Sequence, residues 1–283
     1  MPQSSDKIAI VTGSSSGLGL VSSVALAQSG FTVVASMRDV SRAVALLEAA
    51  KAARVAERIV VRPCDVTSQE QVDALISGVT RDYGTIDLVL NNAGFPMGGF
   101  AEDVTLRELR EQFETNFFGQ VMVTRAVLPV MRAQRSGKIL MMSSASGIAA
   151  VPGLGAYSAS KWALEGWSEA LRMECLPLGI HVSLIEPGSH QSDIWTRNSR
   201  SAAAAPTSPN ANRSRRLRDF AQKTPKEDPA AVARTVLRIA NDPAPRLRYP
   251  VGKMIGTRSW LKFLMPWRRY ETMVLKYMGM DKE

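Results

Sequence analysis

The sequence has few of the residues that build disulfide frameworks or metal sites. Its 283 residues include only two cysteines, Cys64 and Cys175, and two histidines, His181 and His190. Both cysteines fall in segments that we expect to be buried, and no charged N-terminal stretch precedes an apolar run. We therefore expect a reducing, cytoplasmic setting rather than secretion. Because the His, Cys and carboxylate residues show no metal-ligand spacing, no metal site is predicted.

Long apolar runs and internal repeats are also missing. No stretch approaches the roughly 18 apolar residues that a helix needs to cross a bilayer. A hydrophobic content of 45% is nevertheless enough for one sizeable core. We therefore expect one domain over residues 1–252, followed by a basic, amphipathic helical extension over residues 253–283.

Excess positive charge is absent from most of the chain and concentrated near its end. Residues 1–196 hold 16 Lys and Arg against 19 Asp and Glu, whereas residues 197–283 hold 19 against 7. Aromatic and basic side chains alternate over residues 260–270. Such a segment could lie on an anionic membrane surface, cap a neighbouring subunit, or pack on its own domain, which is the arrangement we favour. Basicity without a motif predicts no nucleic-acid binding.

Apolar segments of strand length alternate with helical stretches along the chain. This alternation predicts β-α-β units with right-handed crossovers, and therefore an α/β fold whose parallel sheet is buried on both faces. We expect about seven strands, at residues 7–11, 31–36, 58–62, 86–90, 138–142, 180–185 and 247–251. The low-complexity stretch over residues 198–218 is expected to be a loop that precedes a helix over residues 229–241.

A glycine-rich turn follows the first predicted strand. Gly13, Gly17 and Gly19 are spaced Gly-x-x-x-Gly-x-Gly and lead into an apolar helical run. Glycines let the backbone approach a pyrophosphate closely, and a helix N-terminus offers free N–H groups and the positive end of its dipole. The spacing differs from the common dinucleotide pattern Gly-x-Gly-x-x-Gly, which indicates a different class of nucleotide site.

Four further segments each follow a predicted strand: residues 64–66, 91–94, 142–144 and 186–188. In an open parallel sheet, ligands bind at the carboxyl ends of the strands. These independent segments therefore predict one shared crevice.

Tyr157 and Lys161 lie four residues apart in a predicted helix, so their side chains share one face. A free tyrosine has a pKa of roughly 10 and a free lysine one of roughly 10.4. Because a cation beside a phenol stabilises the phenolate, we expect Lys161 to lower the pKa of Tyr157. The pair would then move protons near neutral pH.

Taken together and in this order, these motifs resemble the classical short-chain dehydrogenase/reductase family over residues 7–195, and more loosely to about residue 252. The resemblance implies a doubly wound, Rossmann-type three-layer sandwich and hydride transfer involving a nicotinamide cofactor. It implies Tyr157 as the acid/base and Lys161 as its cationic partner, which also holds the nicotinamide ribose. Ser144 would bond the substrate oxygen, and Asn116 would kink the central helix and anchor a water connected to Lys161.

The resemblance also implies a set of cofactor-binding residues. These are Gly13, Ser14, Ser16, Gly17, Leu18, Gly19, Arg38, Asp65, Val66, Asn92, Ala93, Gly94, Tyr157, Lys161, Pro187, Gly188 and Ser192. Met37 occupies the position where NAD enzymes usually carry a carboxylate, and Arg38 follows it. Because the guanidinium suits a 2′-phosphate, NADP(H) is predicted. Asp39 would repel that phosphate, so NAD(H) stays the alternative.

The substrate is expected beneath a loop over about residues 189–228, near a set of mostly apolar side chains. With Ser144, these are Phe95, Met97, Leu154 and Trp195. Such a lining favours a hydrophobic ketone or secondary alcohol, and the sequence is similar to the branch that includes steroid and retinol dehydrogenases. His190 is expected to be an ordinary loop residue, with a place near the nicotinamide as the alternative. The resemblance further implies a homodimer or homotetramer.

A second functional class stays open from the sequence. A chain with this fold could bind a nucleotide without catalysis and act as a redox-sensing or membrane-associated interaction protein. The joint presence of Asn116, Ser144, Tyr157 and Lys161 favours an enzyme, because a non-catalytic relative has no need to retain all four.

Overall fold

The structure is a computed structural model that describes residues 7–190, 200–201, 208–253 and 255–281. Its side chains are described over the same ranges except residues 200–201 and 257–260. None of the helices in these ranges combines the length and the apolarity that a bilayer-spanning segment needs.

Seven parallel strands form the central sheet, in the spatial order β3-β2-β1-β4-β6-β7-β9. Their bounds are β1 Ile8–Thr12, β2 Thr32–Met37, β3 Ile59–Pro63, β4 Leu88–Asn91, β6 Gly137–Met142, β7 Ile180–Pro187 and β9 Arg248–Val251. The predicted strands and their parallel pairing are confirmed. The five inner strands are almost continuously buried, as expected for a sheet that is covered on both faces, whereas the edge strands β3 and β9 are partly exposed.

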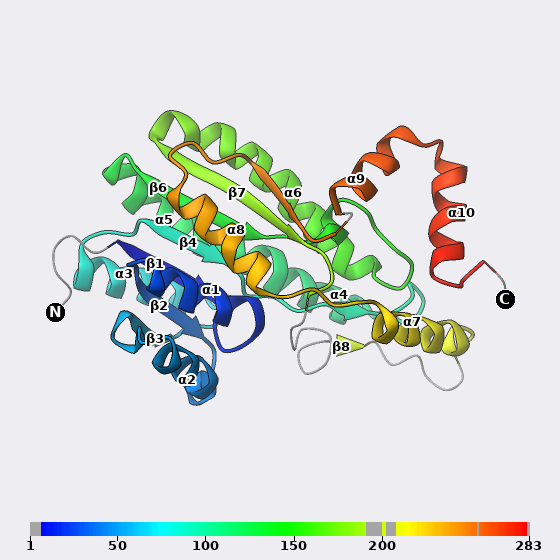
Figure 1. The fold of residues 1–283 in the computed structure, drawn as a ribbon, viewed down its shortest axis with the longest axis horizontal. Helices are drawn as coiled ribbons and strands as arrows, with labels where there is room; N and C mark the ends of the chain where they lie inside the picture. The colour runs from blue at the N-terminus through cyan, green and yellow to red at the C-terminus, as the bar shows by residue number, and fades with distance from the viewer. Residues whose placement is uncertain (1–6, 191–199, 202–207, 254, 282–283) are drawn as a thin grey trace.

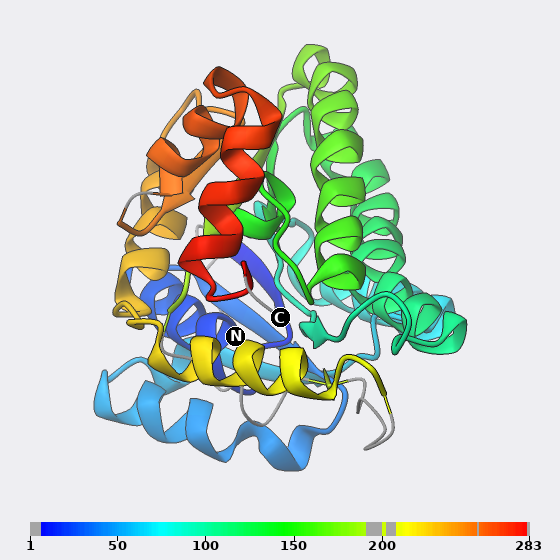
Figure 2. The same ribbon diagram turned by 90° about the vertical axis from the view of Figure 1, so that its right-hand side faces the viewer.

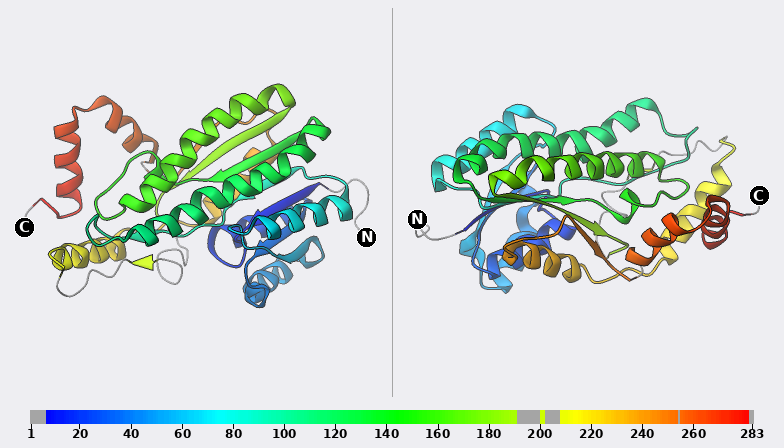
Figure 3. Two further views of the ribbon diagram at one scale, coloured as in Figure 1. Left: turned by 180° about the vertical axis from the view of Figure 1, so that it is seen from behind. Right: turned by 90° about the horizontal axis from the view of Figure 1, so that it is seen from above.

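Helices cover both faces of this sheet and give three layers (Figure 1 and Figure 3). One face packs against α1 (Gly17–Gln28), α2 (Val44–Ala52) and α8 (Ala230–Asn241). The other packs against α3 (Gln69–Tyr83), α5 (Gly119–Gln134) and α6 (Gly155–Cys175). Strand β1 shows how the sequence divides between the two cores: Ala9 and Val11 join the first, while Ile8 and Ile10 join the second. This is the two-residue alternation of a strand that is buried on both sides.

The chain reverses its direction of winding between β1 and β4. From β1 it proceeds outward through β2 to β3, then returns and proceeds through β6 and β7 to β9 on the other side. The loops that leave β1 and β4 at their carboxyl ends therefore diverge and leave a crevice between them, which is where ligands bind in open α/β sheets. The Rossmann-type doubly wound fold is thus confirmed.

The long helix expected around residues 106–133 is interrupted. It consists of α4 (Leu106–Phe113), a π-helical turn over Glu114–Phe118, and α5. Asn116, expected to kink this helix, lies inside the π turn and is fully buried. Turns of this kind widen the backbone spiral and are frequent at functional sites.

The segments outside the main sheet lie near its carboxyl edge. Strand β5 (Met97–Gly98) pairs with β8 (Arg200–Ser201), and α7 spans Ala211–Lys223. The expectation of a loop throughout residues 198–218 is therefore wrong from Ala211 onward, because four arginines there support a helix with one apolar and one solvated face. Beyond β9 the chain forms α9 (Ile255–Leu264) and α10 (Trp267–Tyr277), a hairpin that projects from the body (Figure 1).

Short 3₁₀ turns complete the backbone at Val40–Ala43, Ala56–Arg58, Ala145–Gly147 and Leu176–Leu178. The first of these follows β2 and is capped by Asp39, whose carboxylate accepts hydrogen bonds from Ser41 N at 3.0 Å and Ser41 Oγ at 2.7 Å. The Asp39 carboxylate therefore caps the 3₁₀ turn that follows it.

Gly19 lies at the closest approach between α1 and the turn that precedes it. A Cβ atom there would lie 2.4 Å from the Gly13 carbonyl oxygen and 2.5 Å from Asn92 Nδ2. We expect Gly19→Ala to lower the free energy of unfolding by about 1–3 kcal/mol, the usual cost of overpacking a tight site. Gly166→Ala is the matched control, because a Cβ on that helical glycine meets nothing within 4 Å. Urea unfolding should show Gly166→Ala at least as stable as the parent, and equal stability of the two variants would contradict the tight approach.

Candidate active site

One cavity of about 650 Å³ lies at the carboxyl edge of the sheet, at the reversal point between β1 and β4. Its walls come from the ends of six strands and from α6. Predicted cofactor-binding residues that line it are Gly13, Ser16, Gly17, Leu18, Arg38, Asp65, Val66, Asn92, Ala93, Gly94, Tyr157, Lys161, Pro187 and Gly188. The structure therefore brings most of the predicted set to one place.

Two predicted cofactor contacts differ from the expectation. The Ser14 hydroxyl donates to the Ser36 carbonyl at 3.0 Å and is fully buried, so it joins two strand ends, and Ser15 lines the cavity in its place. Gly19 does not line the cavity but packs directly beneath Gly13. Ser192 and Trp195 lie outside the described residues, and their predicted contacts stay predictions.

The glycine turn and the segment after β4 are tied together by hydrogen bonds. Asn92 Nδ2 donates to the carbonyls of Thr12 at 2.9 Å and Gly13 at 3.0 Å, and Thr12 Oγ1 accepts from the backbone N–H groups of Asn92 and Ala93. Gly13 has a φ of 67°, and a Cβ there would lie 2.8 Å from Ala93 Cα. This bare backbone beside the N-terminus of α1 fits the pyrophosphate of a dinucleotide.

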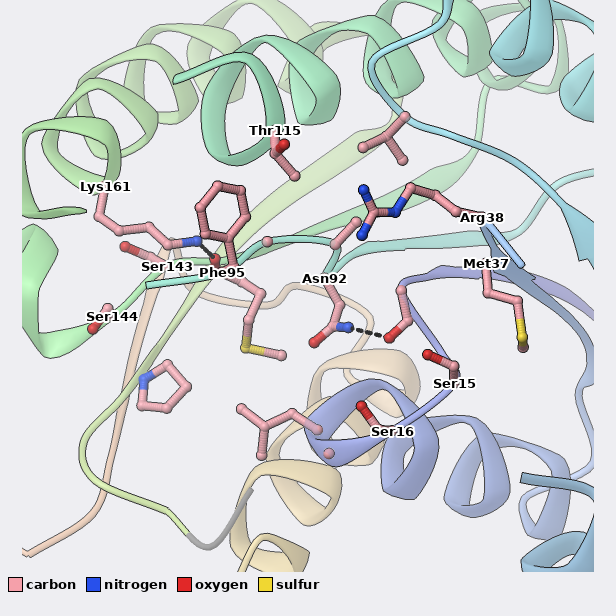
Figure 4. A pocket seen from close by; sticks show the side chains of 18 of the residues that line it. Ser15, Ser16, Met37, Arg38, Asn92, Phe95, Thr115, Ser143, Ser144 and Lys161 are labelled. Atoms are coloured by element: carbon pink, nitrogen blue, oxygen red, sulfur yellow. Dashed lines mark hydrogen bonds between the residues drawn. The ribbon is translucent and has the colours of Figure 1, made fainter. Parts of the chain in front are cut away.

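The proton-transfer residues lie at the opposite end of the cavity from Arg38 (Figure 4). Lys161 is 3% exposed, and its Nζ donates to the Met142 carbonyl at 2.7 Å. Tyr157 is 5% exposed, and its hydroxyl hydrogen-bonds with Ser144. Ser144 also accepts from Ser146 N at 3.1 Å, so this serine both caps a turn and contacts the phenol.

The two serines after β6 point in different directions. Ser144 lies toward Tyr157, whereas Ser143 Oγ lies beside Gly147 next to the Glu165 side chain. Successive residues of an extended strand end face opposite sides, which explains the division. Ser144, the serine that the resemblance implied, is therefore the one that contacts the phenol.

The electrostatics of Tyr157 differ from the expectation. Burial raises the pKa of Tyr157 above its usual value, and the hydrogen bond with Ser144 offsets this only in part. Burial also lowers the pKa of Lys161 to about 8, while the nearby Glu165 carboxylate acts in the opposite direction. The expected lowering of the Tyr157 pKa by Lys161 is therefore wrong: burial sets the direction, and the opposing contribution comes from Ser144.

Asn116 organises the floor of the cavity from within the π turn. Its Oδ1 accepts from Phe95 N at 3.0 Å, and its Nδ2 donates to the Phe95 carbonyl at 3.0 Å and to Ser160 Oγ at 3.3 Å. These bonds fix the backbone just after Gly94 and connect it to α6. The side chain therefore holds the segment after β4 against the helix that carries Tyr157 and Lys161.

A group of charges behind Lys161, in which Glu165 and Glu186 are buried and Arg248 is partly exposed, was missed by the sequence analysis. Arg248 Nε lies 3.1 Å from Glu165 Oε2 and 3.5 Å from Glu186 Oε1, and its Nη2 lies 2.9 Å from Glu169. Burial, together with the neighbouring Glu165 charge, raises the pKa of Glu186 to about 8. Two signals were available: Glu165 follows Lys161 by one helical turn, and Glu186 is a carboxylate at the end of an otherwise apolar strand.

Some of the remaining candidate residues line the cavity and others do not. Phe95 and His190 line the cavity, whereas Met97 and Leu154 do not. His190 is 3% exposed, with Nδ1 3.2 Å from the Gly188 carbonyl and Nε2 without a hydrogen-bond partner among the described residues. Arg42, which the sequence analysis did not select, lines the cavity beside Arg38.

Comparison with curated proteins gives three informative relatives. Uncharacterized oxidoreductase YusZ of Bacillus subtilis is 41% identical over 275 residues, 95% of this chain and 98% of the relative. A 3-ketodihydrosphingosine reductase of Bacteroides thetaiotaomicron is 32% identical over 90% of this chain and 93% of the relative. Human retinol dehydrogenase 8 is 39% identical over 63% of this chain and 57% of the relative.

Solved structures agree with the fold. A short-chain dehydrogenase from Streptomyces avermitilis superposes with a TM-score of 0.81 and 31% identity, over 99% of this chain and 98% of that one. A metagenomic short-chain oxidoreductase in complex with NADP gives a TM-score of 0.68 and 26% identity, over 88% of this chain and 97% of that one. A Burkholderia phymatum enzyme in complex with NAD gives 0.80 at 24% identity, over 93% and 95%. A nicotinamide cofactor is thereby supported, without a preference between NAD and NADP.

The family model described as short chain dehydrogenase matches residues 7–203, which include the glycine turn, Ser144, Tyr157 and Lys161. Together with the relatives named above, this match identifies the chain as an oxidoreductase of the short-chain dehydrogenase/reductase family.

Proposed function

We propose that this protein is an NADP(H)-dependent oxidoreductase that interconverts a hydrophobic ketone and its secondary alcohol. The observation that carries the proposal is the arrangement of Ser144, Tyr157 and Lys161 at one end of a cavity whose centre is a bare glycine turn. A dinucleotide that spanned this cavity would be held at its phosphates by the glycine turn, and its nicotinamide would be held by the residues around Tyr157.

The bound nicotinamide supplies or accepts the hydride, and the protein handles the proton. In our proposal the Ser144 hydroxyl donates to the substrate oxygen and fixes its position. Tyr157, as a neutral phenol, donates its proton to that oxygen when a carbonyl is reduced, or accepts one when an alcohol is oxidised. Lys161 holds the nicotinamide ribose hydroxyls, and Asn116 positions the backbone on which the cofactor rests.

Burial keeps Tyr157 protonated at neutral pH, because its pKa lies above the usual value. A protonated phenol is an acid, so the site as built suits carbonyl reduction more than alcohol oxidation. Alcohol oxidation needs the phenolate and should increase as the pH rises.

Two arginines support the preference for NADP(H). Arg38 and Arg42 both line the cavity near the end of β2, where the adenosine ribose would lie. The Asp39 carboxylate also lines the cavity, and the hydrogen bond from Ser41 lowers its pKa and keeps it charged, so it opposes a 2′-phosphate and the two arginines must outweigh it. A 2′-phosphate would meet two guanidinium groups, which bind phosphate in bidentate fashion.

The hydrophobic character of the substrate rests on Phe95 and on the relatives. Phe95 lines the cavity on the side of Lys161 (Figure 4), and Met97, Leu154 and Trp195 stay candidates for the outer part of the site. Two relatives carry names that refer to lipid-like substrates, a 3-ketosphingoid base and retinol. We propose a steroid-, retinoid- or polyketide-like compound that is polar mainly at the reacting oxygen.

The alternative of a non-catalytic interaction protein is not favoured. The relatives of this chain are named as oxidoreductases, reductases or dehydrogenases. The buried polar groups around Lys161 also cost folding free energy, and catalysis gives a reason to keep them.

We also propose that residues 1–252 form the catalytic domain, that residues 253–283 extend it, and that two copies pair through α5 and α6. The exposed Phe118 and Trp162 support such a pairing.

Replacing the phenol tests the proposed mechanism. Tyr157→Phe should lower kcat for the reduction of a lipophilic ketone by about 10²–10⁴-fold, because the proton donor is lost. NADPH affinity, measured by fluorescence titration, should change little. Tyr83→Phe is the matched control, since Tyr83 ends α3 and does not line the cavity. Unchanged turnover in Tyr157→Phe would remove the mechanism.

The pH profile tests the role of Lys161. Its pKa of about 8 is a lowered value, so the side chain is charged below pH 8 and loses its charge above it. We expect kcat/KM for NADPH, which reports groups of the cofactor-free enzyme, to fall as the pH rises through about 8. Glu165→Gln should move this limb to lower pH, because Glu165 raises the pKa of Lys161. Glu169→Gln should leave the limb in place, and an equal shift in both variants would refute the coupling.

Cofactor choice is tested at Arg38. Arg38→Gln should weaken NADPH binding by about 10–100-fold, the usual value of a charge-assisted hydrogen bond, and leave NADH binding nearly unchanged. Arg81→Gln serves as a control because Arg81 lies in α3, away from the cavity. Fluorescence titration of both reduced cofactors measures the effect. Tighter binding of NADH than of NADPH by the parent protein would contradict the proposed preference.

A further inference from the structure

The hairpin of α9 and α10 carries an unusual concentration of exposed apolar side chains. Of the thirteen large apolar side chains that are exposed in the described part of the chain, five lie in these two helices. Three of them flank the connection between the helices: Phe263 is 73% exposed, Leu264 74% and Trp267 61%. We call these three residues the tip. Soluble proteins seldom expose several large apolar side chains close together unless these side chains bind a partner.

The tip is exposed although the hairpin is firmly attached to the body. Lys262 Nζ donates to the Ile148 carbonyl at 2.7 Å and lies 3.9 Å from the centre of the Trp162 ring. Tyr270 and Met278 on the inner side of α10 are buried. The hairpin is thus held to its own domain through Lys262, and the tip is an apolar surface that these contacts leave uncovered.

Cations follow the tip in α10 and continue onto α7, which lies at the other end of α10 from the tip (Figure 1). Arg268 and Arg269 directly follow Trp267 and are exposed, and Lys276 is exposed in the last turn of α10. Helix α7 adds four arginines and one lysine against a single aspartate. Phe220 of α7 contacts Tyr277 of α10 with ring centres 5.2 Å apart, so the two basic helices are neighbours. Figure 2 shows both on the side that faces the viewer.

This surface adjoins the active site. Ile148, which Lys262 contacts, lies four residues after Ser144, and Trp162 follows Lys161 directly. The hairpin and α7 both lie at the end of the molecule toward which the carboxyl ends of the strands point (Figure 1 and Figure 3). Anything that binds the tip would therefore lie near the end of the cavity where the substrate is expected.

We propose that the tip and its flanking arginines dock on an anionic lipid bilayer. Phe263, Leu264 and Trp267 enter the boundary between headgroups and acyl chains, while Arg268 and Arg269 contact lipid phosphates, the arrangement of interfacial amphipathic helices. A second copy of this chain suits the surface poorly, because a two-fold contact through the tip brings the same cations together. Docking in this orientation places the substrate side of the enzyme next to a reservoir of hydrophobic molecules.

Vesicle sedimentation of the full-length protein tests the proposal. We expect the parent to bind vesicles of phosphatidylglycerol and phosphatidylcholine at about 0.15 M salt, and not vesicles of phosphatidylcholine alone. Phe263→Ser with Leu264→Ser should weaken binding by at least about 100-fold, because two apolar side chains lose their burial. Arg268→Gln with Arg269→Gln should weaken it by about 25-fold, or fivefold for each charge.

A matched control separates the tip from general stickiness. Val44→Ser with Leu47→Ser removes two exposed apolar side chains from α2, which lies at the other end of the sheet, and should leave vesicle binding unchanged. All variants change exposed residues, and turnover of a soluble ketone verifies that each is folded. Equal binding to neutral and anionic vesicles, no binding by the parent, or full binding by the Phe263/Leu264 variant would overturn the proposal. The proposal would also be overturned if the parent did not bind vesicles and the Phe263/Leu264 variant had half the molecular mass of the parent in light scattering. The tip would then be a contact between copies of this chain.

Discussion

The close approach of two chain segments at the reversal point of the sheet is the constraint on which the site depends. Thr12 and Gly13 after β1 are bonded to Asn92 and Ala93 after β4, and the Gly13 backbone leaves no room for a side chain. This contact fixes the separation of the two halves of the sheet. Because the phosphate cradle and the floor below the reacting ring belong to different halves, their relative position follows from it.

The floor is fixed in turn by a chain of buried polar contacts. Asn116 binds the Phe95 backbone and Ser160, and Lys161 binds the Met142 carbonyl at the end of β6. Helix α6 is thereby held to both central strands at the level of the proton-transfer residues. Burial has an electrostatic cost, which is visible in the lowered pKa of Lys161 and the raised pKa of Tyr157. Glu165, balanced by Arg248, reduces that cost for Lys161 because it places a carboxylate one helical turn away.

The parts that the sequence predicted share one property: they follow from local spacing or from strand periodicity. The seven strands, the glycine turn and the pair of Tyr157 and Lys161 are of this kind. The charged group of Glu165, Glu186 and Arg248 joins three elements that are distant in sequence, so local patterns can single out the two glutamates but not their pairing with Arg248. The predicted direction of the Tyr157 pKa shift was wrong for a related reason. A neighbouring cation is visible in the sequence, whereas the amount of water that remains around a phenol is a property of the packed site.

The extension shows how an added segment can affect chemistry without entering the cavity. Lys262 binds the carbonyl of Ile148 and stacks on Trp162, which in turn donates to the Ser146 carbonyl at 3.0 Å. These contacts brace the turn that begins at Ser144 from its outer side. The position of the serine hydroxyl relative to Tyr157 therefore depends on α9 as well as on α6.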